Sequence, residues 1–175
     1  MSRFGKPNPT GRSSGKRTGR SGTLYRPPKG EPWVWLTREL ICSVAWQAMG
    51  INSRRFLDFL LLEQIAHAGT ENGGLLATYD QLEQFGLSRP HISEAIDEAI
   101  ALGLVRVDGG RFRRVATRYR LTMYASLGDL PATNEWKRIT AVHVAALRAE
   151  RRAQSDARKA ARDKHRRSAP ALVAD

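Results

Sequence analysis

The chain has 175 residues, of which 41% are hydrophobic, and its formal net charge is +12. This length leaves room for one ordinary domain with tails. No apolar run approaches the length of a membrane span, and the N-terminus lacks the apolar core of a signal peptide, which argues against a membrane-spanning or exported protein. The lone cysteine, Cys42, excludes an internal disulfide and suits the reducing cytosol, so we expect a cytoplasmic protein.

The basic residues gather at the two ends of the chain and in one central cluster. Residues 1–32 hold eight Lys and Arg against one acid, and residues 137–175 hold eleven against four. The middle has ten Arg against twelve acids, but six of these Arg lie between positions 106 and 120. Such clustering favours a polyanionic partner, because each neutralised phosphate releases condensed counterions. The plainer alternative is a ribosome-like or simply soluble basic protein.

The first 32 residues are rich in Gly, Ser, Pro, Lys and Arg and offer almost nothing to bury, which predicts a disordered basic arm. Such an arm either follows phosphates and a minor groove or is a linker that its charge keeps soluble. Order is predicted to begin at Trp33 and Trp35, two large side chains that need a surface to cover.

Two helices and a short strand are predicted next. Thr37 is the expected N-cap of a helix that continues to Met49, and Ser53 is that of a stronger helix that ends near His67. The second helix is apolar on more than one side, so we expect it at the centre of the domain. Residues 75–77 are predicted to form a short strand.

Residues 78–102 are predicted to form two helices joined by a tight turn. Thr78 is a typical N-cap, Gly86 ends the first helix, and Leu87 is expected to tuck beneath the corner. The hydroxyl of Ser88 is expected to cap the second helix, with Pro90 in its first turn. Apolar residues recur at helical spacing on one face of each helix: Tyr79, Leu82 and Phe85, then Ile92, Ile96, Ala99 and Ile100. This order is typical of a helix-turn-helix, whose second helix enters the major groove of DNA.

Residues 104–107, 108–110 and 118–124 predict a strand, a turn and a strand, as in the wing of a winged helix. Along the second strand, alternation places two sets on opposite faces: Tyr119, Leu121 and Met123 on one, and Arg118, Arg120 and Thr122 on the other. Thr133 is the predicted N-cap of a last helix whose apolar stripe ends at Leu147. Beyond Leu147 we expect a solvated basic helix or coil.

The predicted fold class is therefore mainly α with a small β-wing (α+β). A disordered basic arm occupies residues 1–32, a winged helix-turn-helix domain residues 33–130, and a C-terminal helix with a basic, partly disordered tail residues 131–175.

DNA recognition by this architecture needs exposed side chains near the start of the second helix. The candidates for base reading lie off its apolar stripe: Ser88, Arg89, His91, Ser93 and Glu94. Arg89 is the best candidate for a bidentate contact to guanine. Three acids, Glu94, Asp97 and Glu98, make the rest of this helix repel phosphates, so only its first turn and a half can sit deep in a groove. The alternative is a purely structural helix pair.

The predicted wing carries six arginines: Arg106, Arg111, Arg113, Arg114, Arg118 and Arg120. Arginines at a wing are well placed to reach phosphates or a neighbouring minor groove. A solvated hairpin is the alternative, but six arginines in fifteen residues exceed what solubility requires. This cluster is the strongest functional signal in the sequence.

Catalysis receives little support from the sequence. The four histidines are isolated, and none lies at metal-ligand spacing with Cys42 or an acid. The glycine pairs at 73–74 and 109–110 are turn signals rather than phosphate-binding loops. We expect no enzyme, no metal or other cofactor and no small-molecule ligand.

Six stretches resemble a family of small bacterial winged-helix proteins, many of them carried by plasmids, prophages and integrative elements. They are Trp35–Glu39, Ser43–Trp46, Glu71–Leu75, Thr78–Asp80, Ala101–Leu104 and Arg118–Thr122. More generally, residues 33–124 are similar to the winged helices of MarR-type regulators and plasmid replication initiators. The resemblance implies binding of DNA by the second helix and the wing.

The sequence thus predicts sequence-specific binding to double-stranded DNA by a transcriptional regulator of a mobile element, associated with the nucleoid when bound. A homodimer, formed through residues 33–49 or 136–147, would match a palindromic site. Two alternatives stay open: an accessory protein of plasmid or phage replication initiation, and a protein-interaction adaptor whose tails bind nucleic acid without specificity.

Overall fold

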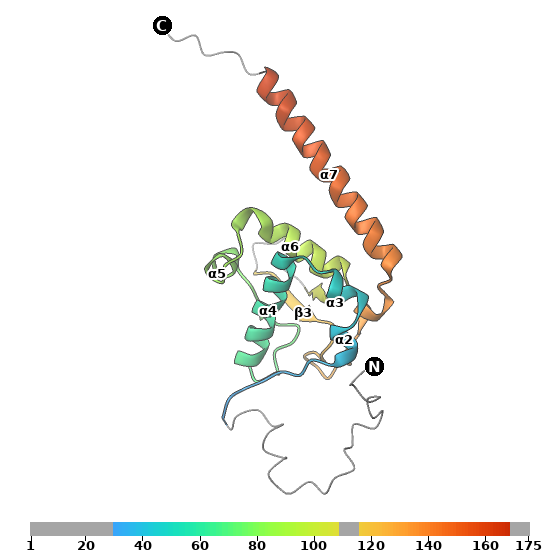
Figure 1. The fold of residues 1–175 in the computed structure, drawn as a ribbon. Helices are drawn as coiled ribbons and strands as arrows, with labels where there is room; N and C mark the ends of the chain where they lie inside the picture. The colour runs from blue at the N-terminus through green and yellow to red at the C-terminus, as the bar shows by residue number, and fades with distance from the viewer. Residues whose placement is uncertain (1–29, 109–115, 169–175) are drawn as a thin grey trace, which may run out of the picture. The chain divides into compact units, whose positions relative to one another are not determined.

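The structure, a computed structural model, describes residues 30–108 and 116–168, with side chains up to residue 160. From Pro32 onward, the described residues form one compact unit of helices around a small sheet (Figure 1). The elements in chain order are α2 (Arg38–Ile41), α3 (Val44–Ala48), α4 (Ile51–Ala66), β1 (Leu75–Leu76), α5 (Tyr79–Gln84), α6 (Arg89–Ala101), β2 (Val105–Val107), β3 (Arg118–Leu121), η1 (Glu135–Arg138) and α7 (Ala141–Ser168). The prediction of a mainly helical α+β fold is confirmed. Most of the predicted basic arm lies outside the described residues.

The helix predicted from Thr37 to Met49 is in fact two short helices. Thr37 caps α2, since its Oγ1 accepts the N–H of Leu40 at 3.2 Å. Ser43 starts α3 in the same way, accepting the N–H of Trp46 at 3.2 Å, and its hydroxyl donates to the carbonyl of Leu40 at 2.6 Å. The helix is interrupted here because the Ser43 side chain forms hydrogen bonds with backbone groups that a continuous helix would pair with one another.

Helix α4 runs through the centre of the unit, as predicted from its apolar composition. Its buried side chains lie on several sides and include Phe56, Leu57, Phe59, Leu60 and Leu61. The prediction that Ser53 caps this helix is wrong. The helix starts three residues earlier, after Gly50, and Ser53 is fully buried, with its hydroxyl donating to the carboxylate of Glu98.

The described strands form an antiparallel sheet in the order β1-β3-β2. β1 confirms the short strand predicted at 75–77 and places Leu75 opposite Tyr119. β3 ends at Leu121, three residues before the predicted end, so Thr122 lies beyond the strand and does not share a strand face with Arg118 and Arg120 as predicted. Thr122 is buried, and its hydroxyl donates to the carbonyl of Gly103 at 2.7 Å.

A buried asparagine joins the loop before β1 to the end of β3. The Nδ2 of Asn72 lies 2.9–3.1 Å from the carbonyl oxygens of Leu121, Tyr124 and Ala125, which share its two N–H groups. Its Oδ1 accepts the N–H of Leu121 at 2.7 Å. Because every polar atom of this side chain is paired, the loop and the strand end are held in one arrangement.

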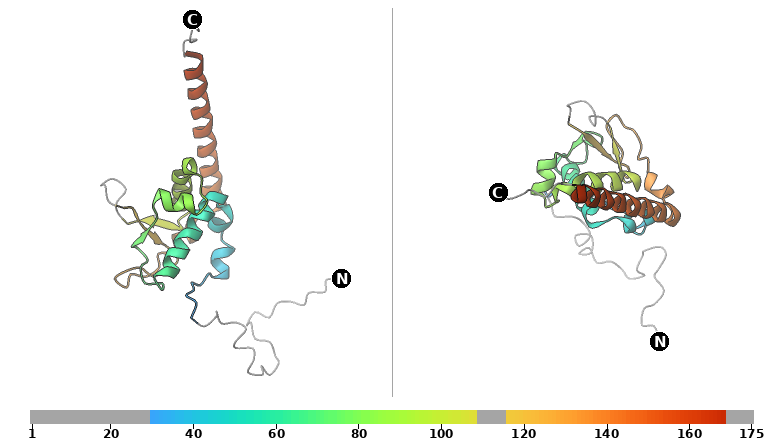
Figure 2. Two further views of the ribbon diagram at one scale, coloured as in Figure 1. Left: turned by 90° about the vertical axis from the view of Figure 1, so that its left-hand side faces the viewer. Right: turned by 90° about the horizontal axis from the view of Figure 1, so that it is seen from above.

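The C-terminal helix does not begin after Thr133 as predicted. Thr133 caps nothing; instead η1 follows Asn134 and buries Trp136, which is 4% exposed. A separate helix, α7, begins after Thr140, whose Oγ1 accepts the N–H of His143 at 3.4 Å. α7 continues to Ser168, so the basic stretch after Leu147 is helical, one of the two states expected for it. Figure 2 shows α7 passing over α6 and projecting from the unit.

Candidate nucleic-acid interface

The turn between α5 and α6 is built as the sequence predicts. Thr78 and Gln81 form a capping box: the Thr78 hydroxyl accepts the N–H of Gln81 at 3.2 Å, and the Gln81 side-chain oxygen accepts the N–H of Thr78 at 2.9 Å. Gly86 ends α5 with φ +97°, a conformation that suits glycine, and Leu87 is buried beneath the corner. These contacts set the direction in which α6 leaves the turn.

The buried face predicted for α5 is narrower in the structure. Of its three apolar residues only Leu82 is buried, whereas Tyr79 is 42% and Phe85 38% exposed. α5 has six residues, and Phe85 meets the rest of the unit through an edge contact to Phe59 at 5.5 Å between ring centroids. The prediction of burial for Tyr79 and Phe85 is therefore wrong, because α5 turns only Leu82 fully into the core.

α6 packs against α4 and leaves the opposite face of its first two turns open to solvent. Its buried residues are Ile92, Ala95, Ile96 and Ala99. The Ser88 hydroxyl makes no capping bond, contrary to prediction, although Ser88 occupies the N-cap position and Pro90 lies in the first turn. All five residues predicted to read bases are exposed at this end: Ser88, Arg89, His91, Ser93 and Glu94.

Arg89 is paired within the protein. Its Nη1 donates to Asp80 Oδ1 at 2.7 Å and to Glu83 Oε2 at 3.0 Å, both on α5. These hydrogen bonds raise the pKa of Arg89 above its ordinary value, first through Asp80 and then through Glu83. The side chains are about half exposed or more, so water and salt screen the pairs. A base contact by Arg89 would have to replace them.

The acids of α6 are covered by arginines of α7. The Nη1 of Arg151 lies 2.7 Å from Glu98 Oε1, and its Nη2 donates to the carbonyl of Glu94 at 3.2 Å. The Nη1 of Arg158 donates to Glu94 Oε1 at 2.7 Å, and this bond is the largest cause of the lowered pKa of Glu94. His91, whose Nδ1 lies 3.6 Å from Glu94 Oε2, adds a weaker contact. The repulsion of phosphates expected from this face is thus reduced within the chain itself.

Glu98 also ties α6 to the start of α4. Its Oε2 accepts the N–H of Gly50 at 3.2 Å and the hydroxyl of Ser53. With only 15% of its side chain exposed, Glu98 has its charge satisfied by three donors from two other helices.

The arginines predicted to form the wing divide into three groups. Arg106 pairs with Glu135 at 2.5 Å, and Arg120, whose side chain is 16% exposed, pairs with Asp108 at 2.6 Å. Arg118 is exposed on β3. The remaining three, Arg111, Arg113 and Arg114, lie outside the described residues.

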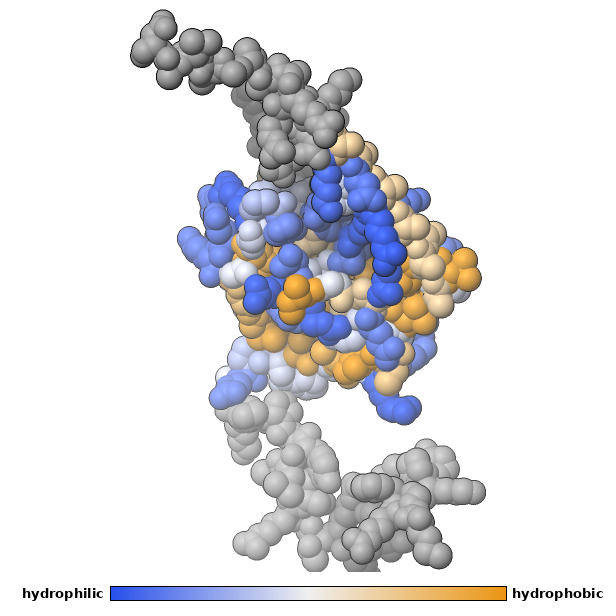
Figure 3. Space-filling view, turned by 45° about the horizontal axis from the view of Figure 1, so that its top comes forward, coloured by the Kyte–Doolittle hydropathy of each residue, from blue (hydrophilic) through white to orange (hydrophobic). Residues whose placement is uncertain are grey.

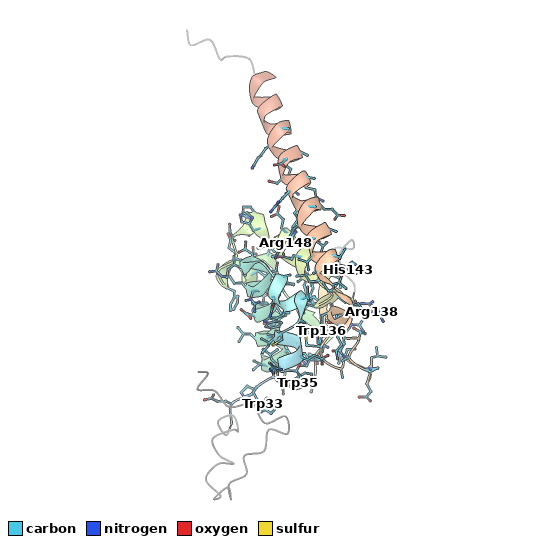
Figure 4. The ribbon with its side chains drawn as sticks, turned by 45° about the vertical axis from the view of Figure 1, so that its right-hand side comes forward. Trp33, Trp35, Trp136, Arg138, His143 and Arg148 are labelled. Carbon is cyan, nitrogen blue, oxygen red and sulfur yellow. The ribbon has the colours of Figure 1, made fainter. Side chains whose placement is uncertain are left out.

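Hydrophilic residues cover most of the surface seen when the top of the unit is brought forward, and apolar residues gather mainly toward its lower and right-hand edges (Figure 3). Arg138, His143 and Arg148 lie along η1 and α7, whereas Trp33 and Trp35 lie far from Arg148 at the opposite end of the unit (Figure 4). Trp33 is 59% and Trp35 48% exposed, although the Trp35 ring meets Tyr124 edge-on at 4.9 Å. The two tryptophan side chains are therefore only partly buried, although the sequence predicts that they pack against a surface.

Two further features bear on function. Across residues 30–108 and 116–168, no helix combines the length and apolarity that a membrane crossing needs. Among the same residues, no three or more His, Cys, Asp and Glu side chains gather as a metal site would require.

No protein-family model matches the sequence, and comparison with curated proteins and with solved structures gives no match either.

The role of α7 beside α6 was not foreseen from the sequence. A signal was present, since Glu94 and Glu98 are four residues apart and Arg151 and Arg158 seven apart, and each spacing returns to one helix face. Nothing local, however, indicates that these two faces meet.

Proposed function

We propose that this chain binds double-stranded DNA in a sequence-specific manner as a winged helix, and acts as a transcriptional regulator of a mobile element. The observation that carries the proposal is the order of elements: α5, a glycine turn, α6 with an exposed first turn, then the antiparallel β2 and β3 with β1 beside them. In a helix-turn-helix of this order, the second helix enters the major groove.

Arg89 remains the proposed reader of guanine despite its ion pairs. The pairs with Asp80 and Glu83 are exposed, so water and salt screen them and they hold Arg89 only weakly. A bidentate contact from arginine to guanine discriminates by about 1–3 kcal/mol. Guanine can therefore replace these weak pairs, whereas a base without its two acceptors cannot, and this difference adds to specificity. Ser93 and His91, exposed on the same two turns, are the proposed second readers.

The proposed backbone contacts follow from the division of the wing arginines. Arg106 and Arg120 fasten β2 and β3 to Glu135 and Asp108, so we assign them a supporting role. Arg118 is exposed, and together with Arg111, Arg113 and Arg114 it is proposed to contact phosphates or the adjacent minor groove.

The experiment that tests the proposal is selection of bound sequences from random duplex DNA with the full chain. We expect one enriched motif, and a palindromic motif would indicate a dimer. Absence of any motif, with binding that vanishes as salt rises, would overturn the proposal.

A second candidate, a protein-interaction adaptor with nonspecific nucleic-acid-binding tails, is favoured by the pairing of Arg89. An arginine held by Asp80 and Glu83 suits a structural link between α5 and α6 as well as it suits a reader. Arg89→Ala discriminates between the two. Readout of DNA predicts a loss of about 1–3 kcal/mol at the selected site and relaxed preference at one position, while an adaptor predicts almost no change in DNA binding.

A further inference from the structure

α7 is much longer than its contact with the rest of the unit. Its 28 residues extend about 42 Å at 1.5 Å per residue. Near its start it buries Val144 in the core, and its ion pairs to α6 end at Arg158. The ten helical residues after Arg158 extend about 15 Å further. Figures 1 and 2 show this part projecting from the unit.

The ion pairs give the direction of α7 along α6. Val144 and Leu147 line a groove with Leu102, just beyond the C-terminal end of α6. Arg151 then reaches Glu98, and Arg158 reaches Glu94, nearer the start of α6. The two helices therefore run in opposite directions, and α7 extends toward the end of α6 that carries the proposed base readers.

The basic residues of α7 fall into two rows. The inner row, Arg151 and Arg158, is occupied by the acids of α6. The outer row consists of Arg148, Arg152 and Lys159, which steps of four and seven residues place on one helix face. All three are exposed, and none forms an ion pair with another described side chain.

Asp156, four residues after Arg152, lies beside this row, which still keeps an excess of positive charge. Such an excess costs stability through mutual repulsion and is retained most simply where an anion is bound. The rise between Arg148 and Lys159 is about 16 Å. About three or four consecutive phosphates of one DNA strand span a comparable distance, since the backbone of a duplex advances 3.4 Å per nucleotide along the axis and also winds around it.

We propose that the outer row of α7 is a second DNA-binding surface that contacts phosphates beside the groove entered by α6. The inner row neutralises Glu94 and Glu98, so that the duplex meets arginines rather than carboxylates on this side of α6. This inference rests on the proposed function, because it requires α6 to face DNA. Contacts from the outer row to phosphates would increase the affinity for DNA without distinguishing one base sequence from another.

The test is the salt dependence of binding to the selected duplex by the full chain and by the triple variant Arg148→Gln, Arg152→Gln, Lys159→Gln. Loss of three phosphate contacts makes the slope of log K against log salt shallower by about 2.7. Between 50 and 200 mM salt, the unmodified chain should therefore lose about 40-fold more affinity than the variant. The selected motif should be the same for both.

Two controls complete the design. The charge-conserving variant Arg148→Lys, Arg152→Lys should keep the original slope, and Arg38→Gln, an exposed arginine on α2, should change it by less than one. An unchanged slope in the triple variant overturns the inference while leaving the proposed function intact. Failure of the unmodified chain to select any motif overturns both.

Discussion

Replacing Glu98 by glutamine tests how α6 is held against its neighbours. The carboxylate accepts the N–H of Gly50 at 3.2 Å and the hydroxyl of Ser53, and it pairs with Arg151 at 2.7 Å. Its side chain is 15% exposed, whereas that of Arg151 is 43% exposed. The bond from the fully buried Ser53 is therefore better shielded than the exposed bond from Gly50, and it should contribute most to the effect.

Glutamine keeps the shape of Glu98 but loses its charge. Hydrogen bonds to a charged group contribute about 1.5–3 kcal/mol and neutral ones about 0.5–1.5 kcal/mol, so the bond from the buried Ser53 weakens by about 1 kcal/mol and the exposed bond from Gly50 by about 0.5 kcal/mol. The half-exposed pair with Arg151 adds about 0.5–1 kcal/mol. We expect Glu98→Gln to lower the free energy of unfolding by about 2–3 kcal/mol.

Urea denaturation followed by tryptophan fluorescence measures this change. Glu150→Gln is the matched control, because it removes one carboxylate charge from an exposed position on α7 and should change stability by less than about 0.5 kcal/mol. Arg151→Gln should cost only about 0.5–1 kcal/mol, since Glu98 keeps its donors on α4. If Glu98→Gln were no more destabilising than Glu150→Gln, the proposed anchoring would be refuted.

Two other predictions concern the end of β3 and the turn after α6. Burial raises the pKa of Tyr124 from 10.0 to about 12, so the unfolded chain ionises first and stability should fall as the pH rises from 10 to 12. Tyr124→Phe should abolish this fall, which is measured by comparing the urea midpoints at pH 9 and 11.5. The variant also loses the hydrogen bond that the Tyr124 hydroxyl donates to the Trp35 carbonyl at 2.6 Å. Gly103 has φ +65°, and a Cβ there would lie 2.9 Å from the carbonyl carbon of Glu135. Gly103→Ala should lower the free energy of unfolding by about 2 kcal/mol or more. Gly86→Ala should lower it by only about 1 kcal/mol, because φ is +97° there but the space around the glycine is open. Equal thermal midpoints for the two variants would contradict the close approach of Gly103 to Glu135.

Local patterns predicted the parts of the fold that depend on neighbouring residues. The capping role of Thr78, the glycine turn at Gly86 and the burial of Leu87 all follow from side chains within a few positions of one another. The break at Ser43 was missed because apolar spacing runs across it, while a single hydroxyl decides where the helix is interrupted.

Long-range contacts account for what local patterns could not predict. Asn72 bonds to residues about 50 positions away, and Arg158 to Glu94 across 64 positions. Exposed placement of Arg89 was predicted, but its pairing with Asp80 and Glu83 depends on how α5 meets α6. Sequence spacing indicates which residues share a face, and tertiary packing decides which faces meet.

Sequence-specific recognition of DNA is the central claim, and the most direct measurement is the ratio of two dissociation constants. The full chain is titrated into the selected duplex and into a scrambled duplex of equal length and composition, both at about 150 mM salt. We predict that the selected duplex binds at least about 10³-fold more tightly, as specific DNA-binding proteins do. Equal affinity for the two duplexes would contradict the claim and leave a basic protein that binds DNA only through its charge.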